Sequence, residues 1–175
     1  MSDVLKSNVE YNYGNSIEAM NQILADAHVL WVKTHQAHWY MINSRNVMSD
    51  FLILHDWLDK PLDFLIDLID DVAERIVMLN GKPVSTLKSF LDSTTLQEED
   101  IDYFEYSSDE LLSRTVADFK AFRDELSNAI KIMDSEGNVS DSNKLQDDLS
   151  ETNKYIWFMQ ATLGRTTLNN NFNKI

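Results

Sequence analysis

Apolar residues recur at steps of three and four along most of the chain, which is the spacing of amphipathic helices. The first such segment runs from about residue 16 to residue 40, with Ser16 as the expected N-cap. The positions along its stripe are Ile17, Met20, Leu24, Ala27, Trp31, Thr34 and His38. The polar run 43–46 follows, so we expect a loop there.

A second helical pattern begins near residues 49–50 and ends at Asn80-Gly81, a pair typical of a helix C-terminus. The positions along its stripe are Leu52, His55, Asp59, Leu62, Ile66, Ile69, Ala73 and Ile76. Pro61 lies inside this pattern, where it removes one backbone hydrogen bond and kinks a helix. The pattern therefore predicts either one long bent helix or a helix that stops at Pro61.

Two further helices follow a long connection. Residues 84–106 form this connection, and its segment 85–91 is expected to make a short helix. Ser107 or Ser108 caps the third long helix, which closes at residues 136–138. The last long helix opens near residues 140–141 and stops at Gly164.

Four long helices predict an all-α fold, a four-helix bundle over residues 16–164. The connection between the second and third long helices exceeds what adjacent helices need. It favours a long crossover of the ferritin-like kind, with the short helix inside it. Residues 1–15 are expected to be a tail or short helix, and residues 165–175 a polar tail.

Composition excludes several classes of site. The chain has 175 residues, no Cys and a net charge of −14. The lack of Cys excludes disulfides and thiolate metal sites. No apolar run reaches the length of a membrane span and no signal-peptide pattern opens the chain, so we expect a cytoplasmic protein. An acidic surface repels nucleic-acid phosphates and attracts cations, although it also serves solubility alone.

Five side chains carry the candidate chemistry: His38, His55, Asp59, Asp70 and Glu74. Imidazoles and carboxylates of this kind suit a first-row transition metal such as iron. His55 and Asp59 are four residues apart, as are Asp70 and Glu74, so each pair shares a helix face.

The length of the second helix separates these two pairs. Asp59 and Asp70 are 11 residues apart, or roughly 16 Å along a helix, whereas a metal ligand lies at about 2 Å. If all five residues make one site, Asp70 and Glu74 must come from another copy of the chain. The motif therefore predicts a homo-oligomer as well as a metal.

Four segments resemble the signatures of the Dps family, the DNA-binding proteins from starved cells. They are residues 33–39 around His38-Trp39, residues 54–59, residues 69–83 and residues 155–164. The resemblance covers most of residues 16–164 and, because four segments match in order, it is specific. Classical ferritins instead carry Glu-x-x-His motifs, and this chain has none.

The resemblance implies a hollow twelve-subunit shell that oxidises Fe(II), preferably with hydrogen peroxide, and stores ferric mineral. Its ferroxidase sites lie at two-fold interfaces, with His38, His55 and Asp59 from one subunit and Asp70 and Glu74 from the next. Removing iron and peroxide would protect DNA from oxidative damage.

The chain departs from the family pattern in one loop. His38 and His55 are 17 residues apart, about five more than in the family, so we expect an insertion near residues 43–47. The alternative interpretation is therefore a DNA-binding protective shell with a weak or altered ferroxidase site. Lys6 is the candidate DNA contact of a tail with few cations, and DNA binding would place the protein at the nucleoid.

Other polar and aromatic residues have simpler interpretations. His28 and His35 share a helix face, where packing or exposure to solvent is favoured over an accessory metal site. Trp39 is expected in the core, shielding the site. The acids at the start of the last helix are expected to form a solvated face. The resemblance also implies that such acids line pores for iron entry, and the candidates are Asp141, Asp147, Asp148 and Glu151.

Overall fold

A computed structural model describes residues 13–41, 48–100 and 106–164, with side chains from residue 52 onward in the second range. Within these ranges every regular element is a helix. The helices are α1 (Gly14–Tyr40), α2 (Met48–Met78), α3 (Leu87–Ser93), α4 (Ser108–Glu136) and α5 (Val139–Thr162). The predicted all-α fold, with four long helices and a short one in the crossover, is confirmed. The predicted tails and the insertion at 43–47 lie outside the described residues.

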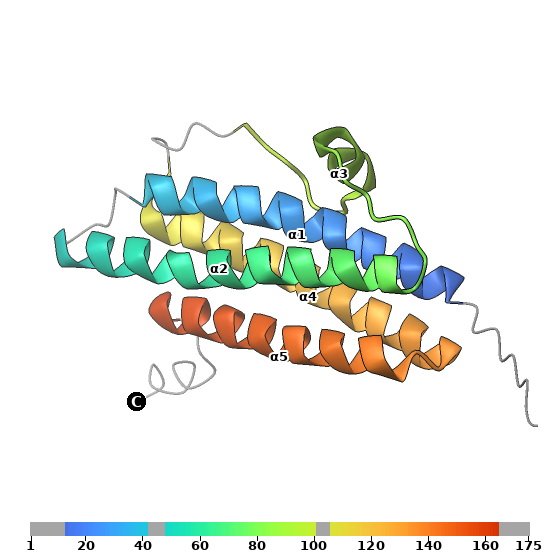
Figure 1. The fold of residues 1–175 in the computed structure, drawn as a ribbon. Helices are drawn as coiled ribbons and strands as arrows, with labels where there is room; N and C mark the ends of the chain where they lie inside the picture. The colour runs from blue at the N-terminus through green and yellow to red at the C-terminus, as the bar shows by residue number, and fades with distance from the viewer. Residues whose placement is uncertain (1–12, 42–47, 101–105, 165–175) are drawn as a thin grey trace, which may run out of the picture.

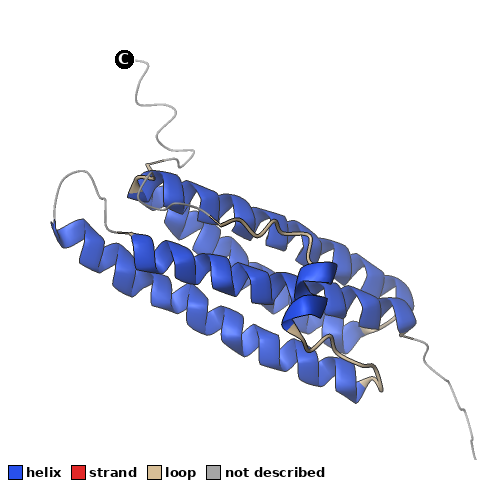
Figure 2. Cartoon of the chain, turned by 90° about the horizontal axis from the view of Figure 1, so that it is seen from above, coloured by secondary structure: helices blue, strands red, loops and turns tan. Residues whose placement is uncertain are grey.

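The four long helices lie side by side in one bundle, and α3 stands outside it against α1 (Figure 1). Helix α1 packs against both α2 and α4, while α5 packs along α4 and makes few contacts with α2. The view from above shows the crossover running along the outside of the bundle (Figure 2). One long face of α2, which carries Asp59, Ile66 and Asp70, is exposed in the single chain, and we call it the open face.

The buried face of α2 differs from the predicted stripe. Leu58, Leu65 and Leu68 are fully or almost fully buried, whereas Leu52 and Ile66 are exposed. A pattern of apolar residues cannot distinguish two apolar faces of one helix, since both satisfy the spacing of three and four. The predicted stripe therefore mixed the core face of α2 with a second, open face.

Helix α2 continues through Pro61, so the alternative in which the helix stops there is wrong. The hydroxyl of Tyr155 on α5 donates to the carbonyl oxygen of Lys60, directly before the proline, at 3.3 Å. Burial, and then the charge of Glu151, raises the pKa of Tyr155 to about 12, so the hydroxyl keeps its proton. Tyr155 thus links α5 to α2 beside Pro61.

The N-terminus of α1 is capped by a residue distant in sequence. The helix begins at Gly14, so Ser16 lies in its first turn and the prediction of Ser16 as N-cap is wrong. The Glu136 carboxylate at the end of α4 accepts hydrogen bonds from the Ser16 amide at 2.8 Å and its hydroxyl at 2.6 Å. It also accepts from the amide of Asn15 at 3.1 Å. Glu136 therefore satisfies donors that a local N-cap would satisfy.

We expect Glu136→Gln to lower the melting temperature at neutral pH. We also expect the melting temperature of this variant to decrease less than that of wild type as the pH is lowered. Burial opposes ionisation of Glu136, but the hydrogen bonds from Ser16 and Asn15 outweigh it and lower its pKa. A carboxyl whose pKa is lower in the folded than in the unfolded chain stabilises the fold at pH values above its unfolded pKa. This contribution is lost as the pH falls through its pKa in the folded chain. Thermal unfolding between pH 3 and 7 measures both effects. The exposed Glu18→Gln is the control, and an unchanged acid slope in Glu136→Gln would show that the cap is unimportant.

The other helix ends follow the sequence more closely. Ser107 caps α4 in a reciprocal capping box with Glu110. Gly137 ends α4 with a φ of 72°, a conformation that favours glycine. Helix α5 begins at Val139, slightly before the predicted start. Helix α2 ends at Met78, and Asn80, which follows it, has a φ of 60°.

Buried polar contacts fix the crossover to α1. The Asp26 carboxylate accepts hydrogen bonds from the Thr94 hydroxyl at 2.7 Å and the Thr95 amide at 2.6 Å. The ammonium of Lys33 donates to the Gln97 carbonyl at 2.6 Å and pairs with Asp118 of α4 at 3.0 Å. These contacts hold the long crossover at one position along the bundle.

Candidate metal centre

The imidazoles of His38 and His55 lie against each other where α1 and α2 meet. Their ring centroids are 3.8 Å apart and the rings are nearly parallel, at 24°. His38 lies near the C-terminal end of α1, and His55 two turns into α2. The longer loop between them has therefore not moved His55 out of reach of His38.

Each ring of this histidine pair bonds to the backbone of the other residue. Nδ1 of His38 lies 2.9 Å from the carbonyl oxygen of His55, and Nδ1 of His55 lies 3.0 Å from that of His38. A carbonyl oxygen only accepts, so each Nδ1 donates a proton, and in the neutral imidazole Nε2 then has the lone pair. Fixing one ring nitrogen in this way is how proteins orient a histidine that binds metal through the other.

Asp59 lies next to the histidine pair. Its Oδ1 is 3.6 Å from Nδ1 of His38, an ion pair when that histidine is protonated. Its side chain is 61% exposed in the single chain. Asp59 projects from the open face of α2.

Asp70 and Glu74 are also exposed, and they lie three and four turns further along α2. The structure thus brings together His38, His55 and Asp59, but not the other two predicted ligands. Among the described residues of one chain, no three His, Asp or Glu side chains have the arrangement of a metal site. A five-ligand site consequently requires a second chain.

A group of ion pairs joins α2 to α5 beside Asp70 and Glu74. The Arg75 guanidinium pairs with Asp141 at 2.8 Å and, less closely, with Asp71 at 3.4 Å. The Lys144 ammonium pairs with Asp71 at 2.9 Å and with Asp148 at 2.6 Å. Burial opposes ionisation of Asp71, but Lys144 and then Arg75 outweigh it and lower its pKa. We call these five residues the α2–α5 ion network.

The sequence analysis missed this network. Asp141 and Asp148 are buried in ion pairs, so the predicted solvated face is wrong for these two, whereas Asp147 is exposed. That Asp141, Asp147 and Asp148 line a pore stays a prediction. The signal in the sequence was the spacing of four residues between Asp71 and Arg75 and between Lys144 and Asp148. That spacing indicates pairs within a helix and does not show which helices face each other.

The remaining histidines of α1 pack against aromatic rings. His28 stacks on Phe90 of α3 at 3.7 Å, and His35 lies 4.2 Å from the ring of Trp31. Of the two expected alternatives to a metal site, packing holds for both residues. Trp39 is 59% exposed, so its predicted place in the core is wrong for a single chain.

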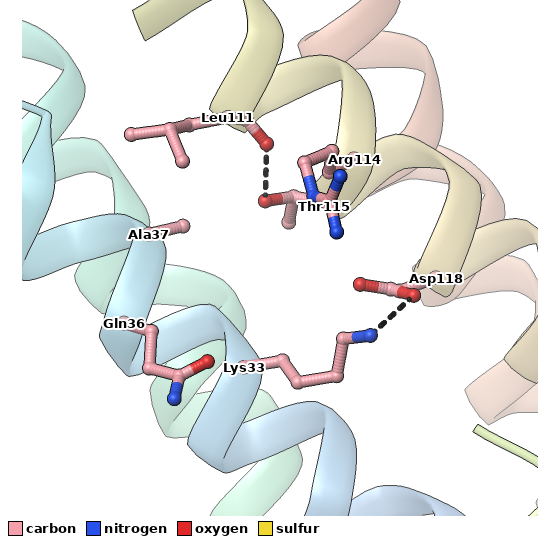
Figure 3. Close-up of a pocket in the computed structure, with 7 residues that line it drawn as sticks. All are labelled: Lys33, Gln36, Ala37, Leu111, Arg114, Thr115 and Asp118. Atoms are coloured by element: carbon pink, nitrogen blue, oxygen red, sulfur yellow. Dashed lines mark hydrogen bonds and ion pairs between the residues drawn. The ribbon is translucent and has the colours of Figure 1, made fainter. Parts of the chain in front are cut away.

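Two pockets lie outside this centre. One, of about 20 Å³, lies between α1 and α4, where Lys33 and Asp118 pair across it (Figure 3). It has room for about one water molecule and not for a substrate. The other, of about 310 Å³, is mostly apolar and lies between α1 and α3 beside His28 and Phe90. Neither pocket gathers the groups that metal chemistry needs.

Comparison with known sequences shows the family. The chain matches the ferritin-like domain over residues 17–169. It is 32% identical to the DNA protection during starvation protein of Listeria innocua over 151 residues, which are 86% of this chain and 93% of the relative. It is 29% identical to general stress protein 20U of Bacillus subtilis over 148 residues, 85% of this chain and 97% of that protein.

Solved structures give the same result. Dps from Listeria innocua soaked with cobalt has a TM-score of 0.81 and 31% identity, over 87% of this chain and 94% of that one. Dps from Staphylococcus aureus has a TM-score of 0.78 and 25% identity, over 87% of this chain and 97% of that one. None of the described helices is long and apolar enough to cross a membrane. The chain belongs to the Dps proteins of the ferritin-like family.

Proposed function

We propose that the protein oxidises Fe(II) at sites shared between two copies of the chain and stores the ferric product inside a shell of twelve copies. Each site takes His38, His55 and Asp59 from one copy and Asp70 and Glu74 from the other. Membership of the Dps proteins supports an iron-storage and DNA-protection function of this kind. The metal-soaked Dps structures of Listeria innocua, with cobalt in one case and zinc in another, are consistent with metal binding.

The register of the ligands along α2 is the observation that carries the proposal. His55 precedes Asp59 by four residues, and Glu74 follows Asp70 by four. Consider two antiparallel α2 helices, with Asp59 of one copy level with Asp70 of the other. His55 of the first copy is then level with Glu74 of the second. A two-fold axis repeats this arrangement, so one pairing of two chains completes two sites.

The exposed face of α2 suits such a pairing. Asp59, Asp70 and Glu74 all lie on it, together with the side chain of Ile66, which is exposed in the single chain. The centre of the antiparallel register falls close to Ile66. An exposed apolar side chain near the centre, with ligands toward both ends, is what a two-fold interface with two metal sites requires.

Imidazole nitrogens and carboxylate oxygens bind Fe(II) and also stabilise Fe(III). When two Fe(II) ions each give one electron, one hydrogen peroxide molecule takes up two electrons and two protons and leaves as two water molecules. The reaction therefore consumes both reactants of hydroxyl-radical formation. DNA is protected by this chemistry without direct contact, and a net charge of −14 per chain attracts the cation substrate.

Oxidation of Fe(II) by limiting peroxide, followed by the absorbance of the ferric product, tests the proposal. We expect oxidation to be faster than in buffer and the ferric iron to stay with the protein during size-exclusion chromatography. A rate equal to that of buffer would contradict the proposal. Direct DNA contact through Lys6 stays a prediction, since Lys6 lies outside the described residues.

A further inference from the structure

We propose that Lys144 of α5 is a positioning residue for the shared metal site. By holding Asp71, it fixes the turn of α2 that presents Asp70 and Glu74 to the neighbouring copy. This inference rests on the proposed function, because the positioned residues are ligands in that proposal. Among the described residues, Lys144 forms ion pairs with Asp71 and Asp148 and none with Asp70 or Glu74.

The contacts of Lys144 reach across two helices. Its ammonium lies 2.9 Å from Oδ2 of Asp71 on α2 and 2.6 Å from Oδ1 of Asp148 on its own helix. The side chain of Asp148 is 7% exposed, so it anchors the ammonium from the inside of the bundle. Lys144 is thus held on α5 and pairs with α2 from there.

Helix α2 is placed in the bundle mainly by its packing against α1, and its contacts with α5 are fewer. Aromatic rings of α2 contact Tyr155 and Phe158 of α5 in the part of α2 that precedes Asp70. Tyr155 links the two helices beside Lys60, about three turns before Asp70. At the end that carries Asp70 and Glu74, the cross-helix ion pairs are those of Lys144 with Asp71 and of Arg75 with Asp141.

The effect of rotation can be estimated from helix geometry. A carboxylate lies roughly 6 Å from the helix axis, so a rotation of about 10° moves it by about 1 Å. Functional groups must be held to about 0.5 Å and 10–20° of the productive geometry. Because Asp70 is the residue before Asp71, and Glu74 the one before Arg75, fixing Asp71 and Arg75 also fixes the direction of the two ligands.

The main test is the double variant Lys144→Met with Asp148→Leu. Removing both charges breaks the tie to Asp71 without leaving an unpaired buried carboxylate, and such exchanges preserve stability in other proteins. The net charge does not change. The matched control is Lys88→Met with Asp92→Asn, which removes an ion pair of 2.7 Å that also joins residues four apart but lies within α3. Lys144→Arg keeps the cation and should rescue binding.

Binding of Co(II) to the assembled protein, measured by visible absorption, is the readout. We expect about tenfold weaker binding in Lys144→Met/Asp148→Leu, the size of effect seen when a partner of a metal ligand is lost. The control pair and Lys144→Arg should stay within about twofold of wild type. Equal affinity in the main variant and wild type, or an equal loss in the control pair, would overturn the proposal.

A second variant keeps the test valid if the double variant does not assemble. Asp71→Asn breaks the same contact from α2, and exposed Asp67→Asn removes a charge from α2 one turn earlier without touching the network. Weaker Co(II) binding in Asp71→Asn than in Asp67→Asn supports the proposal, and equal binding refutes it. If wild-type protein binds no Co(II), the proposed function itself fails. If wild type binds Co(II) and only these comparisons fail, Lys144 alone was misassigned.

Discussion

Replacing Asp70 with asparagine should slow peroxide-dependent oxidation of Fe(II) on the order of 100-fold, since losing even an outer partner of a metal ligand costs about 10- to 100-fold. Asparagine has the same shape but offers no anionic oxygen to a cation. Asp70 is exposed in the single chain, so the substitution leaves no buried group unpaired. The initial rate of absorbance change with limiting peroxide measures the effect.

The matched control for this prediction is Asp67→Asn, which removes an exposed acid from the same helix one turn earlier. It should keep most of the activity, because Asp67 is not a ligand in the proposed site. Thermal unfolding of both variants should match wild type. An Asp70→Asn protein as fast as wild type would remove Asp70 from the site.

Ile66→Asp should prevent pairing of the chains and abolish iron oxidation without altering any ligand. Ile66 is 47% exposed in the single chain and lies near the centre of the proposed antiparallel α2 pairing. Two aspartates brought together there would lose apolar contact and repel each other across the two-fold axis. Sedimentation velocity measures the assembly state, and the peroxide assay measures oxidation in the same sample.

Val139→Asp is the control for this substitution. Val139 is 63% exposed at the start of α5, a helix that does not take part in the proposed pairing of α2 with α2. It should leave pairing and oxidation intact, while Ile66→Asp yields single chains that oxidise Fe(II) no faster than buffer. Pairing that survives in Ile66→Asp would place the interface on another face.

The fold followed from the sequence because its signals are local. Few glycines and prolines, clear steps of three and four, and caps at Ser107 and Gly137 define four long helices without knowledge of their packing. The length of the crossover then favoured the ferritin-like order. Ser16 was misassigned as N-cap because its partner, Glu136, lies 120 residues away.

The errors about α2 have one physical cause. Leu52 and Ile66 were placed on one stripe with the core residues because their spacing fits a helix face, yet both are exposed in the single chain. A helix that packs inside its own chain on one side and against a second copy on the other carries two apolar faces. The spacing of apolar residues indicates both faces. It does not show whether the same chain or a second copy covers a given face.

The candidate site was only partly accessible to sequence reasoning. Spacing identified the candidate ligands and indicated that Asp59 and Asp70 are too far apart to share a metal within one chain. The bonds between each histidine Nδ1 and the opposite backbone required the packing of α1 on α2. The ion network of Lys144 required the placement of α5, which no local pattern encodes.

Complementation between two inactive variants tests the sharing of the site most directly. A His38→Ala chain lacks a ligand on one side of the site, and an Asp70→Asn chain lacks one on the other. When both are coexpressed and assemble together, a mixed pair contains one site with both defects and one site with all five ligands. With random pairing, about a quarter of all sites are intact, as two-fold symmetry requires.

The oxidation rate of the coassembled protein is the quantity to measure, against each variant assembled alone. If the site is shared between chains, the two separate variants are inactive and the coassembled protein recovers about a quarter of the wild-type rate. If all ligands act within one chain, every chain carries a defect and the coassembled protein stays as inactive as the separate variants.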